Sequence, residues 1–88
     1  MDRYIELMDR IHELEAENHL LPKGSISYKK IKDSTYPYLQ LREGRHVRSS
    51  YISKEDLPEL QEKIVRRRQN EEDIRKYKLE VQRIVQME

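Results

Sequence analysis

Hydrophobic residues at the start of the chain recur in alternating steps of three and four. They are Tyr4, Leu7, Ile11, Leu14 and Leu21, and Asn18 falls on the same line. This spacing places all of them on one face of a helix, as in the seam of a coiled coil. Pro22 lacks the backbone donor that another helical turn would need, and Gly24 lets the chain turn. The pattern therefore predicts a helix over residues 1–21.

The middle of the chain, residues 25–52, changes to alternation of apolar and polar positions. Three segments alternate in this way: residues 25–32, 35–42 and 46–52. Asp33, Ser34 and Gly44 lie between them and are common hairpin residues, so we expect an antiparallel three-stranded meander. Pro37 cannot donate to a ladder. It predicts that the second strand is at a sheet edge there, or that the missing donor points away from a neighbour.

A long second helix is predicted over residues 54–88. Ser53 precedes a run of acidic residues, which is the pattern of a helix N-cap. The apolar stripe of this helix is Leu57, Leu60, Ile64, Ile74, Tyr77, Val81 and Ile84, interrupted by residues 66–73, which contain no apolar residue. The predicted fold is α+β in one domain, residues 1–88, with the two helices paired as an antiparallel coiled-coil hairpin.

The two predicted helices differ in length. At 1.5 Å per residue the first spans about 30 Å and the second about 50 Å. If the sheet lies at the closed end of the hairpin, the first helix covers the second only as far as residues 66–73. The last four stripe residues, Ile74, Tyr77, Val81 and Ile84, would then lack an internal partner. We expect this segment to pair with a second copy of the chain, to bend back at Asn70, or to dock on a different protein.

Composition limits the classes of protein that remain. The chain has 88 residues, of which 40% are charged and 35% hydrophobic, so its core must be thin. The 18 basic and 17 acidic residues nearly cancel, and the apolar spacing is regular, which argues against full disorder. The absence of cysteine excludes disulfides and thiol catalysis. Without an export signal or an apolar membrane span in the sequence, we expect a soluble cytoplasmic protein that does not enter a membrane.

Charge is unevenly distributed between the predicted elements. Residues 1–21 contain six acids and two bases, residues 22–53 two acids and seven bases, and residues 54–88 nine of each. The predicted sheet is therefore the basic element. A local positive surface of this kind attracts anionic partners, although the whole chain is close to neutral.

The second predicted strand has one polar and one apolar face. Alternation places Tyr36, Tyr38, Gln40 and Arg42 on the outer face, while Leu39 and Leu41 are expected to pack inward with Val47, Tyr51 and Ile26 or Ile31. We expect His46, Arg48 and the turn residue Arg45 to lie near the outer face. The predicted contact surface consists of Tyr36, Tyr38, Gln40, Arg42, Arg45 and Arg48.

Tyrosine and arginine side chains on a small sheet are typical of nucleic-acid binding. Rings stack on the bases of a single strand and cations pair with its phosphates. A three-stranded sheet also fits the major groove of duplex DNA. Two other interpretations stay open, because cross-strand packing of tyrosine and arginine stabilises a sheet without any ligand and because a protein partner could use the same surface.

Four short motifs carry a family resemblance. They are Leu21–Ser25 (LPKGS), Tyr38–Gln40 (YLQ), Arg42–Gly44 (REG) and Tyr51–Ile52 (YI), followed by a long charged helix. Over residues 21–68 the chain resembles a widespread group of short bacterial, archaeal and mobile-element proteins of unknown function. Leu41 stands where that group usually has an aromatic residue. The sheet also resembles, in fold alone, the arm-type DNA-binding domains of phage integrases.

Catalytic and metal sites are not predicted. The chain has no nucleophile elbow and no phosphate-binding glycine loop, so we expect a non-enzyme without a cofactor. Glu15 and His19 are four residues apart on a helix, but two ligands do not make a closed metal site. The basic run 66–68 has acidic neighbours within helical reach, which favours a salt-bridged solvent face over a phosphate site.

The sequence therefore predicts a small non-enzymatic module that binds nucleic acid through the basic aromatic sheet. The alternative is a protein-interaction factor, such as a phage or plasmid-encoded inhibitor or adaptor acting on a larger host assembly, for example a nucleoprotein complex. A third interpretation is a homodimer formed through the C-terminal helix.

Overall fold

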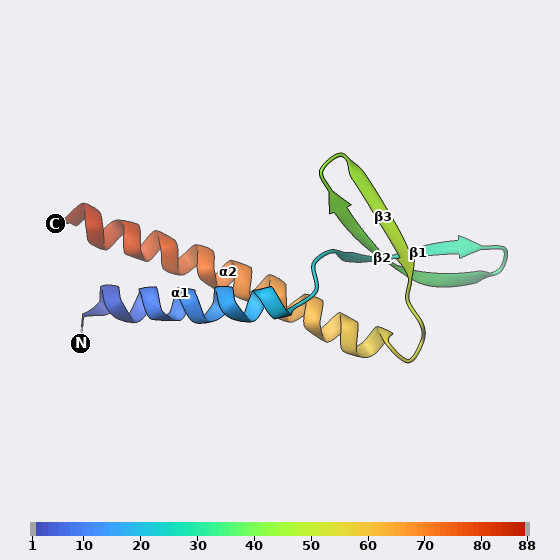
Figure 1. Cartoon of the computed structure of the whole chain (residues 1–88), viewed down its shortest axis with the longest axis horizontal. Helices are drawn as coiled ribbons and strands as arrows, with labels where there is room; N and C mark the ends of the chain where they lie inside the picture. The colour runs from blue at the N-terminus through green and yellow to red at the C-terminus, as the bar shows by residue number, and fades with distance from the viewer. Residues whose placement is uncertain (1, 88) are drawn as a thin grey trace. The chain divides into compact units, whose positions relative to one another are not determined.

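The computed structural model describes residues 2–87. Its elements, in order, are α1 (Arg3–Leu20), β1 (Ser25–Ile31), β2 (Ser34–Glu43), β3 (His46–Tyr51) and α2 (Leu57–Met87) (Figure 1). The predicted α+β fold is confirmed. The chain divides into two compact units, which we call the helical unit (up to Leu21 and from Arg66 on) and the sheet unit (Pro22–Val65). The long helix α2 contributes to both.

The ends of α1 follow from local sequence. Asp2 is the N-cap, and its carboxylate accepts a hydrogen bond of 3.0 Å from the backbone N–H of Tyr4. The helix ends at Leu20 because Leu21, which precedes Pro22, is extended (φ −101°, ψ 144°). The predicted stop at Pro22 is confirmed.

In the helical unit, α1 runs antiparallel to the C-terminal part of α2 (Figure 1). Leu7, Ile11 and Leu14 form its core, with 1–2% of their surface exposed. Ion pairs near the two ends of α1 match this direction. Arg3 Nε lies 2.6 Å from Glu80 Oε2, and Arg66 Nε lies 2.6 Å from Glu17 Oε1. The predicted antiparallel pairing of the two helices is confirmed.

The prediction that the end of α2 lacks an internal partner is wrong. The segment that begins at Arg66 lies beside α1, and Ile74, Tyr77, Val81 and Ile84 within it are half-buried. The reason is that Leu57–Val65 belongs to the sheet unit, where Ile64 is 4% exposed. The suggested bend at Asn70 is wrong as well, since α2 is one continuous helix. Binding of these four residues to a second copy or to another protein stays a prediction. It no longer follows from an uncovered stripe, because α1 lies beside this segment.

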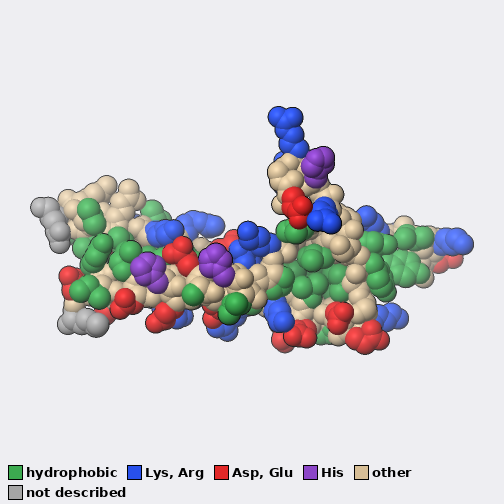
Figure 2. All heavy atoms as spheres, in the orientation of Figure 1, with side chains coloured by type: hydrophobic (Ala, Val, Ile, Leu, Met, Phe, Trp, Pro, Cys, Tyr) green, Lys and Arg blue, Asp and Glu red, His purple; other side chains and the backbone are tan. Residues whose placement is uncertain are grey.

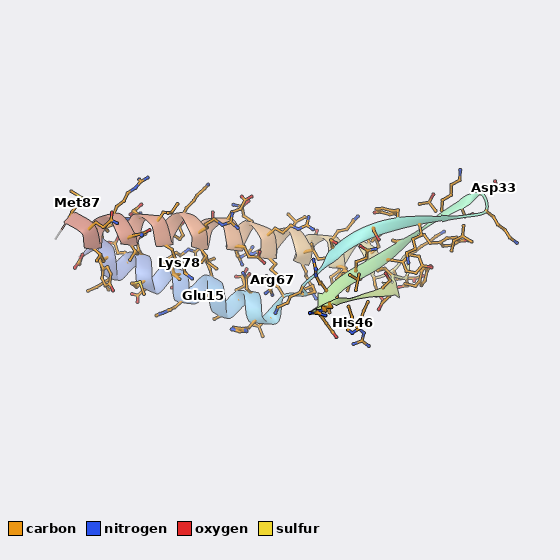
Figure 3. All side chains as sticks on the ribbon, turned by 90° about the horizontal axis from the view of Figure 1, so that it is seen from above. Glu15, Asp33, His46, Arg67, Lys78 and Met87 are labelled. Carbon is orange, nitrogen blue, oxygen red and sulfur yellow. The ribbon has the colours of Figure 1, made fainter. Side chains whose placement is uncertain are left out.

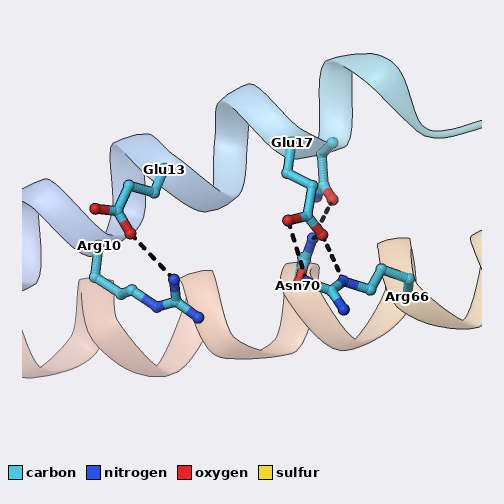
Figure 4. Close-up of polar contacts among 6 residues, drawn as sticks. Arg10, Glu13, Glu17, Arg66 and Asn70 are labelled. Carbon is cyan, nitrogen blue, oxygen red and sulfur yellow. Dashed lines mark hydrogen bonds and ion pairs between the residues drawn. The ribbon is translucent and has the colours of Figure 1, made fainter.

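The polar stretch of α2 contains a buried amide pair. Asn70 is 4% exposed and Asn18 is 7% exposed. The Nδ2 atom of Asn70 donates to Oδ1 of Asn18 at 2.9 Å and to Oε1 of Glu17 at 2.9 Å (Figure 4). Hydrogen bonds from Arg66 and then from Asn70 lower the pKa of Glu17. A polar pair within an apolar seam can form in only one alignment, so it sets the register of the two helices.

Arg67 donates to carbonyl groups at the end of α1, and one of them, that of Asn18, also accepts a hydrogen bond of 3.2 Å from Leu21 N. Its Nη1 atom donates to the carbonyl oxygens of Asn18 and Leu21, the latter at 2.8 Å, and its side chain lies between the helices (Figure 3). The last carbonyls of a helix have no partner inside that helix, and basic side chains commonly supply one. The basic run therefore mixes exposed ion pairing, as predicted, with a part-buried cap that the sequence did not indicate.

The sheet is an antiparallel meander in the order β1-β2-β3, as predicted. Each turn has two residues. Lys32–Asp33 joins the paired residues Ile31 and Ser34, and Gly44–Arg45 joins Glu43 and His46. Asp33 and His46 mark the two hairpin ends of the sheet (Figure 3). The first residue of each turn has a positive φ, 57° at Lys32 and 60° at Gly44.

Two residues fit the backbone of β2 closely. Pro37 is buried, and it lies one residue beyond the end of the β2–β3 ladder, whose last pair is Tyr38 with Tyr51. This agrees with the predicted edge position, and the carbonyl of Pro37 accepts from Ile52 N at 3.0 Å. A Cβ on Gly24 would lie 2.5 Å from the carbonyl oxygen of Gln40, so the chain can enter the sheet there only with glycine.

The core of the sheet unit is small. Ile52 and Ile64 are 5% and 4% exposed and form it together with Pro37. Ser53 does cap the turn that leads into the helix, because its Oγ accepts from Asp56 N at 3.3 Å. The regular helix α2 begins at Leu57, slightly later than predicted.

Candidate nucleic-acid interface

The register of the strands determines which side chains share a face. Directly opposed residues in antiparallel strands point to the same side of a sheet. Tyr36, Tyr38, Gln40 and Arg42 alternate along β2 and therefore share one side, as predicted. Lys29 is opposite Tyr36, and Tyr51 is opposite Tyr38. We call this side the tyrosine face and define it by Lys29, Tyr36, Tyr38, Gln40, Arg42 and Tyr51.

The predicted assignment of β3 is wrong. Arg48 is opposite Leu41, which places it on the reverse side of the sheet. Val47 and Tyr51, expected in the core, are 61% and 55% exposed and lie on the tyrosine face. Arg45 is exposed in the turn. The two-residue turn Gly44–Arg45 sets this register, and counting outward from it would have placed Tyr51 beside Tyr38.

Three tyrosine rings meet on the tyrosine face. The ring centroids of Tyr36 and Tyr51 are 6.3 Å apart with an interplanar angle of 60°, and those of Tyr38 and Tyr51 are 5.9 Å apart at 73°. These edge-to-face contacts are favourable for aromatic pairs. The ammonium group of Lys29 lies 4.5 Å from the centre of the Tyr38 ring. Tyr36 remains 37% exposed and Tyr51 55% exposed.

Charge on the tyrosine face is of one sign. The complete set of strand residues on this side is Ser25, Ser27, Lys29, Ile31, Ser34, Tyr36, Tyr38, Gln40, Arg42, Val47, Ser49 and Tyr51. Within these strands, all of which the structure describes, this side has two bases and no acid. Neither Lys29 nor Arg42 forms an ion pair with any residue in 2–87.

The two arginines that the sequence grouped together have different surroundings. The Nε atom of Arg42 donates to the carbonyl oxygen of Gly44 at 3.3 Å, which holds this guanidinium near the β2–β3 turn. Arg48 Nη1 instead lies 3.4 Å from Glu43 Oε1 on the reverse side. Basic side chains lie over the end of the β2–β3 hairpin together with acidic and histidine side chains (Figure 2). Arg42 and Arg48 therefore carry the same charge on opposite sides of the same sheet, so the effects of substituting them can be compared.

The reverse side of the sheet is less buried than expected. Leu39 and Leu41 are half-buried, and so are Tyr38 and Gln40 on the tyrosine face, so the two sides differ less in burial than alternation predicted. Tyr28, on the reverse side, accepts a hydrogen bond of 3.3 Å from Gln61 of α2 through its hydroxyl. The two faces differ in charge and ring content more than in exposure.

The helical unit contains a shallow hollow of about 220 Å³. It is lined by Glu15, Asn18, His19, Arg67 and Ile74. Glu15 and His19 are the pair considered as metal ligands, and the Arg67 guanidinium beside them would repel a cation. Among residues 2–87, no group of three or more histidine, aspartate or glutamate side chains could hold a metal ion.

Comparison with known proteins identifies a family. Residues 4–62 match a domain of unknown function, DUF6788. The chain belongs to this family. No curated protein and no solved structure matches the chain. In the part of the chain that the structure describes, neither helix combines the length and the apolar character needed to cross a membrane.

The DUF6788 match extends from α1 through the three strands into the beginning of α2. It thus includes every residue of the tyrosine face and the buried seam residues of α1. The segment from Arg66 on, which packs beside α1, lies outside the matched range. Membership confirms the expected relation to proteins of unknown function and assigns no activity.

Proposed function

We propose that this protein is a non-enzymatic nucleic-acid-binding module and that the tyrosine face is its contact surface. The observation that supports the proposal is a face without acids that combines three tyrosine rings with two cations, Lys29 and Arg42, neither of which forms an ion pair with any described residue. Phosphate groups would pair with Lys29 and Arg42, and the rings would contact bases or sugars. Arg45, exposed in the adjoining turn, would extend the positive surface.

Electrostatics favours an anionic partner for the sheet unit. Residues 22–53 contain seven bases and two acids. Of these acids, Glu43 is paired with Arg48 on the reverse side, so it does not neutralise the tyrosine face. A phosphate contributes more binding free energy when it contacts a cation without an ion-pair partner than when it contacts a cation that already has a carboxylate partner.

The test is a salt titration of binding to a labelled oligonucleotide, followed by fluorescence anisotropy. At about 50 mM salt we expect measurable affinity that falls as salt rises, because phosphate contacts release counterions. Arg42→Ala should weaken binding several-fold and reduce the salt slope by about one. Arg48→Ala is the matched control, because it removes the same charge from the same small sheet but from the reverse side.

Two results would contradict the proposal. One is the absence of binding to both DNA and RNA at low salt. The other is an equal, small effect of Arg42→Ala and Arg48→Ala, which would mean that net charge matters and the tyrosine face does not. Circular dichroism and thermal unfolding of each variant verify that the fold is intact.

A protein-interaction factor that inhibits or adapts a larger host assembly is the second proposal, and it has less support. The apolar stripe of α2 that could bind such a partner lies in the segment that packs beside α1. Sedimentation at two protein concentrations tests whether this stripe forms a homodimer, and a strict monomer excludes that form. A cytoplasmic location and occurrence in phages or other mobile elements stay predictions.

A further inference from the structure

We infer that the nucleic acid bound by the tyrosine face is single-stranded, with one base stacked on Tyr36 and another on Tyr51. The inference rests on the proposed function and narrows its ligand. It is carried by three features of the face: which rings are free, how the free rings are oriented, and where the cations stand.

Tyr36 and Tyr51 are the rings available for stacking. Tyr38 is half-buried, with Lys29 over its ring at 4.5 Å and the Tyr51 ring 5.9 Å away. Tyr36 and Tyr51 are 37% and 55% exposed. Tyr38 therefore acts as a support that orients Tyr51 and Lys29, and the platform offers two ring faces to a ligand.

The geometry of these two rings does not match a stacked helix. Their centroids are 6.3 Å apart and their planes are inclined by 60°. Successive bases in duplex DNA are parallel and about 3.4 Å apart, and each already stacks on its neighbours. Two bases that lie on these rings must be separated and tilted relative to each other. A flexible single strand permits this, whereas a duplex would have to be unstacked.

One cation lies beside the rings, and the other lies further along β2 on the same side. Lys29 is directly opposite Tyr36, next to the platform. Arg42 is six residues from Tyr36 on the same side, which is about 20 Å at 3.4 Å per residue. Gln40 lies between Tyr38 and Arg42 and presents an amide that can pair with a base edge. A strand that stacks on the platform can thus reach one phosphate contact beside the rings, at Lys29, and another near the β2–β3 turn, at Arg42.

The experiment compares a non-self-complementary strand of about 12 nucleotides, as DNA and as RNA, with the DNA duplex of the same sequence. Fluorescence anisotropy at about 50 mM salt should show the single strand bound roughly 10-fold or more tightly than the duplex. Preference for the DNA strand or the RNA strand supports the inference equally, because both offer the same base faces.

Ring variants test stacking directly. Tyr36→Leu and Tyr51→Leu keep an apolar side chain but remove the flat face, and each should weaken single-strand binding roughly 10-fold. Tyr36→Phe and Tyr51→Phe keep the ring and should bind like the unmodified protein. Tyr28→Leu is the matched control, since Tyr28 is 54% exposed but lies on the reverse side. A 2-aminopurine base within the strand adds a spectroscopic signature, because its fluorescence changes on stacking and this change should be lost in the leucine variants.

The outcomes separate this inference from the proposed function. Equal or tighter binding of the duplex, or leucine variants that bind as well as phenylalanine variants, overturns the stacking inference while Arg42 dependence preserves the proposed function. Absence of binding to every probe overturns both. Thermal unfolding of each variant, compared with Tyr28→Leu, shows whether a loss of affinity reflects a loss of fold.

Discussion

The helical unit and the sheet unit use their polar side chains in opposite ways. In the helical unit, Asn18 and Asn70 are buried and bonded to each other, and the last carbonyls of α1 are capped by Arg67. In the sheet unit, Lys29 and Arg42 are exposed and form no ion pair with any described residue. Asn18, Asn70 and Arg67 fix the alignment of α1 with α2, whereas Lys29 and Arg42 are the cations that we propose bind a ligand.

The apolar residues show the same contrast. Leu7, Ile11 and Leu14 in α1 are 1–2% exposed, whereas β3 is exposed throughout and Tyr51 keeps more than half of its surface. Burial gives stability, and exposed rings give binding capacity at the cost of stability. From this contrast we expect the helical unit to supply most of the free energy of folding and the sheet unit to supply the proposed contact surface.

The largest expected effect is from Leu7→Ala. Leu7 is 1% exposed, so its truncation should cost about 4 kcal/mol of stability by lost transfer energy and by the cavity left behind. Leu20→Ala is the control in the same helix, where Leu20 is 86% exposed, and should change stability by less than about 0.5 kcal/mol. Urea unfolding followed by circular dichroism measures both. Similar costs for the two variants would remove the contrast between seam and surface.

In the sheet unit we expect the largest cost from a backbone position. Gly24→Ala places a Cβ 2.5 Å from the carbonyl oxygen of Gln40 at a φ of 108°, and should cost about 3 kcal/mol. Gly44→Ala meets no atom within 4 Å and should cost about 1 kcal/mol from its φ of 60° alone. The same unfolding measurement ranks them. A Gly44→Ala cost equal to that of Gly24→Ala would show that steric approach to β2 is unimportant.

Substitutions in the buried amide pair should cost less stability, and their effects should not be additive. Asn70→Ala leaves the Asn18 amide buried without its partner and should cost about 2 kcal/mol. The double variant with Asn18→Ala should cost less than the sum of the two single variants, by about 1 kcal/mol. A double-mutant cycle from urea unfolding measures this coupling. Strict additivity would mean that the two amides do not act as a pair.

The smallest expected effect is on the stability of the protein at acidic pH. The pKa of Glu17 is lowered by hydrogen bonds from Arg66 and Asn70, and the pKa of Glu80 is lowered by its hydrogen bond from Arg3. A carboxylate with a lowered folded-state pKa stabilises the fold fully above its unfolded pKa of about 4.3, and this contribution is lost as the pH falls through the folded-state pKa. The melting temperature should therefore fall less steeply below this pH in Glu17→Gln than in the unmodified protein. Glu13→Gln, in the exposed pair with Arg10, is a control from the same helix (Figure 4).

Much of the fold could be predicted because its signals are local. The three-and-four spacing in α1, Pro22, the alternation in residues 25–52 and Gly44 each act within a few residues of the chain. They predicted both helices, all three strands and the antiparallel meander. The row of Tyr36, Tyr38, Gln40 and Arg42 on one face also followed, because it depends only on the period of a single strand.

The errors concern relations between segments. Arg48 and Tyr51 were assigned to the wrong sides because the side-chain period is two, so a shift of one residue in the pairing of β3 with β2 exchanges its faces. The segment of α2 that packs beside α1 was also predicted wrongly, for a similar reason. Helical spacing shows which face of α2 is apolar, but it does not show how the chain divides that face between the sheet and α1.

This protein's sequence by itself determined the kind and order of its elements and the basic, tyrosine-rich character of its sheet, since these depend on neighbouring residues. Only the tertiary structure decided that Lys29 and Tyr51 join Tyr36 and Tyr38, that Asn18 meets Asn70, and that α2 pairs with α1 from Arg66 on. These contacts join residues far apart in the chain. Their choice depends on the relative free energies of alternative pairings, which no short stretch of sequence contains.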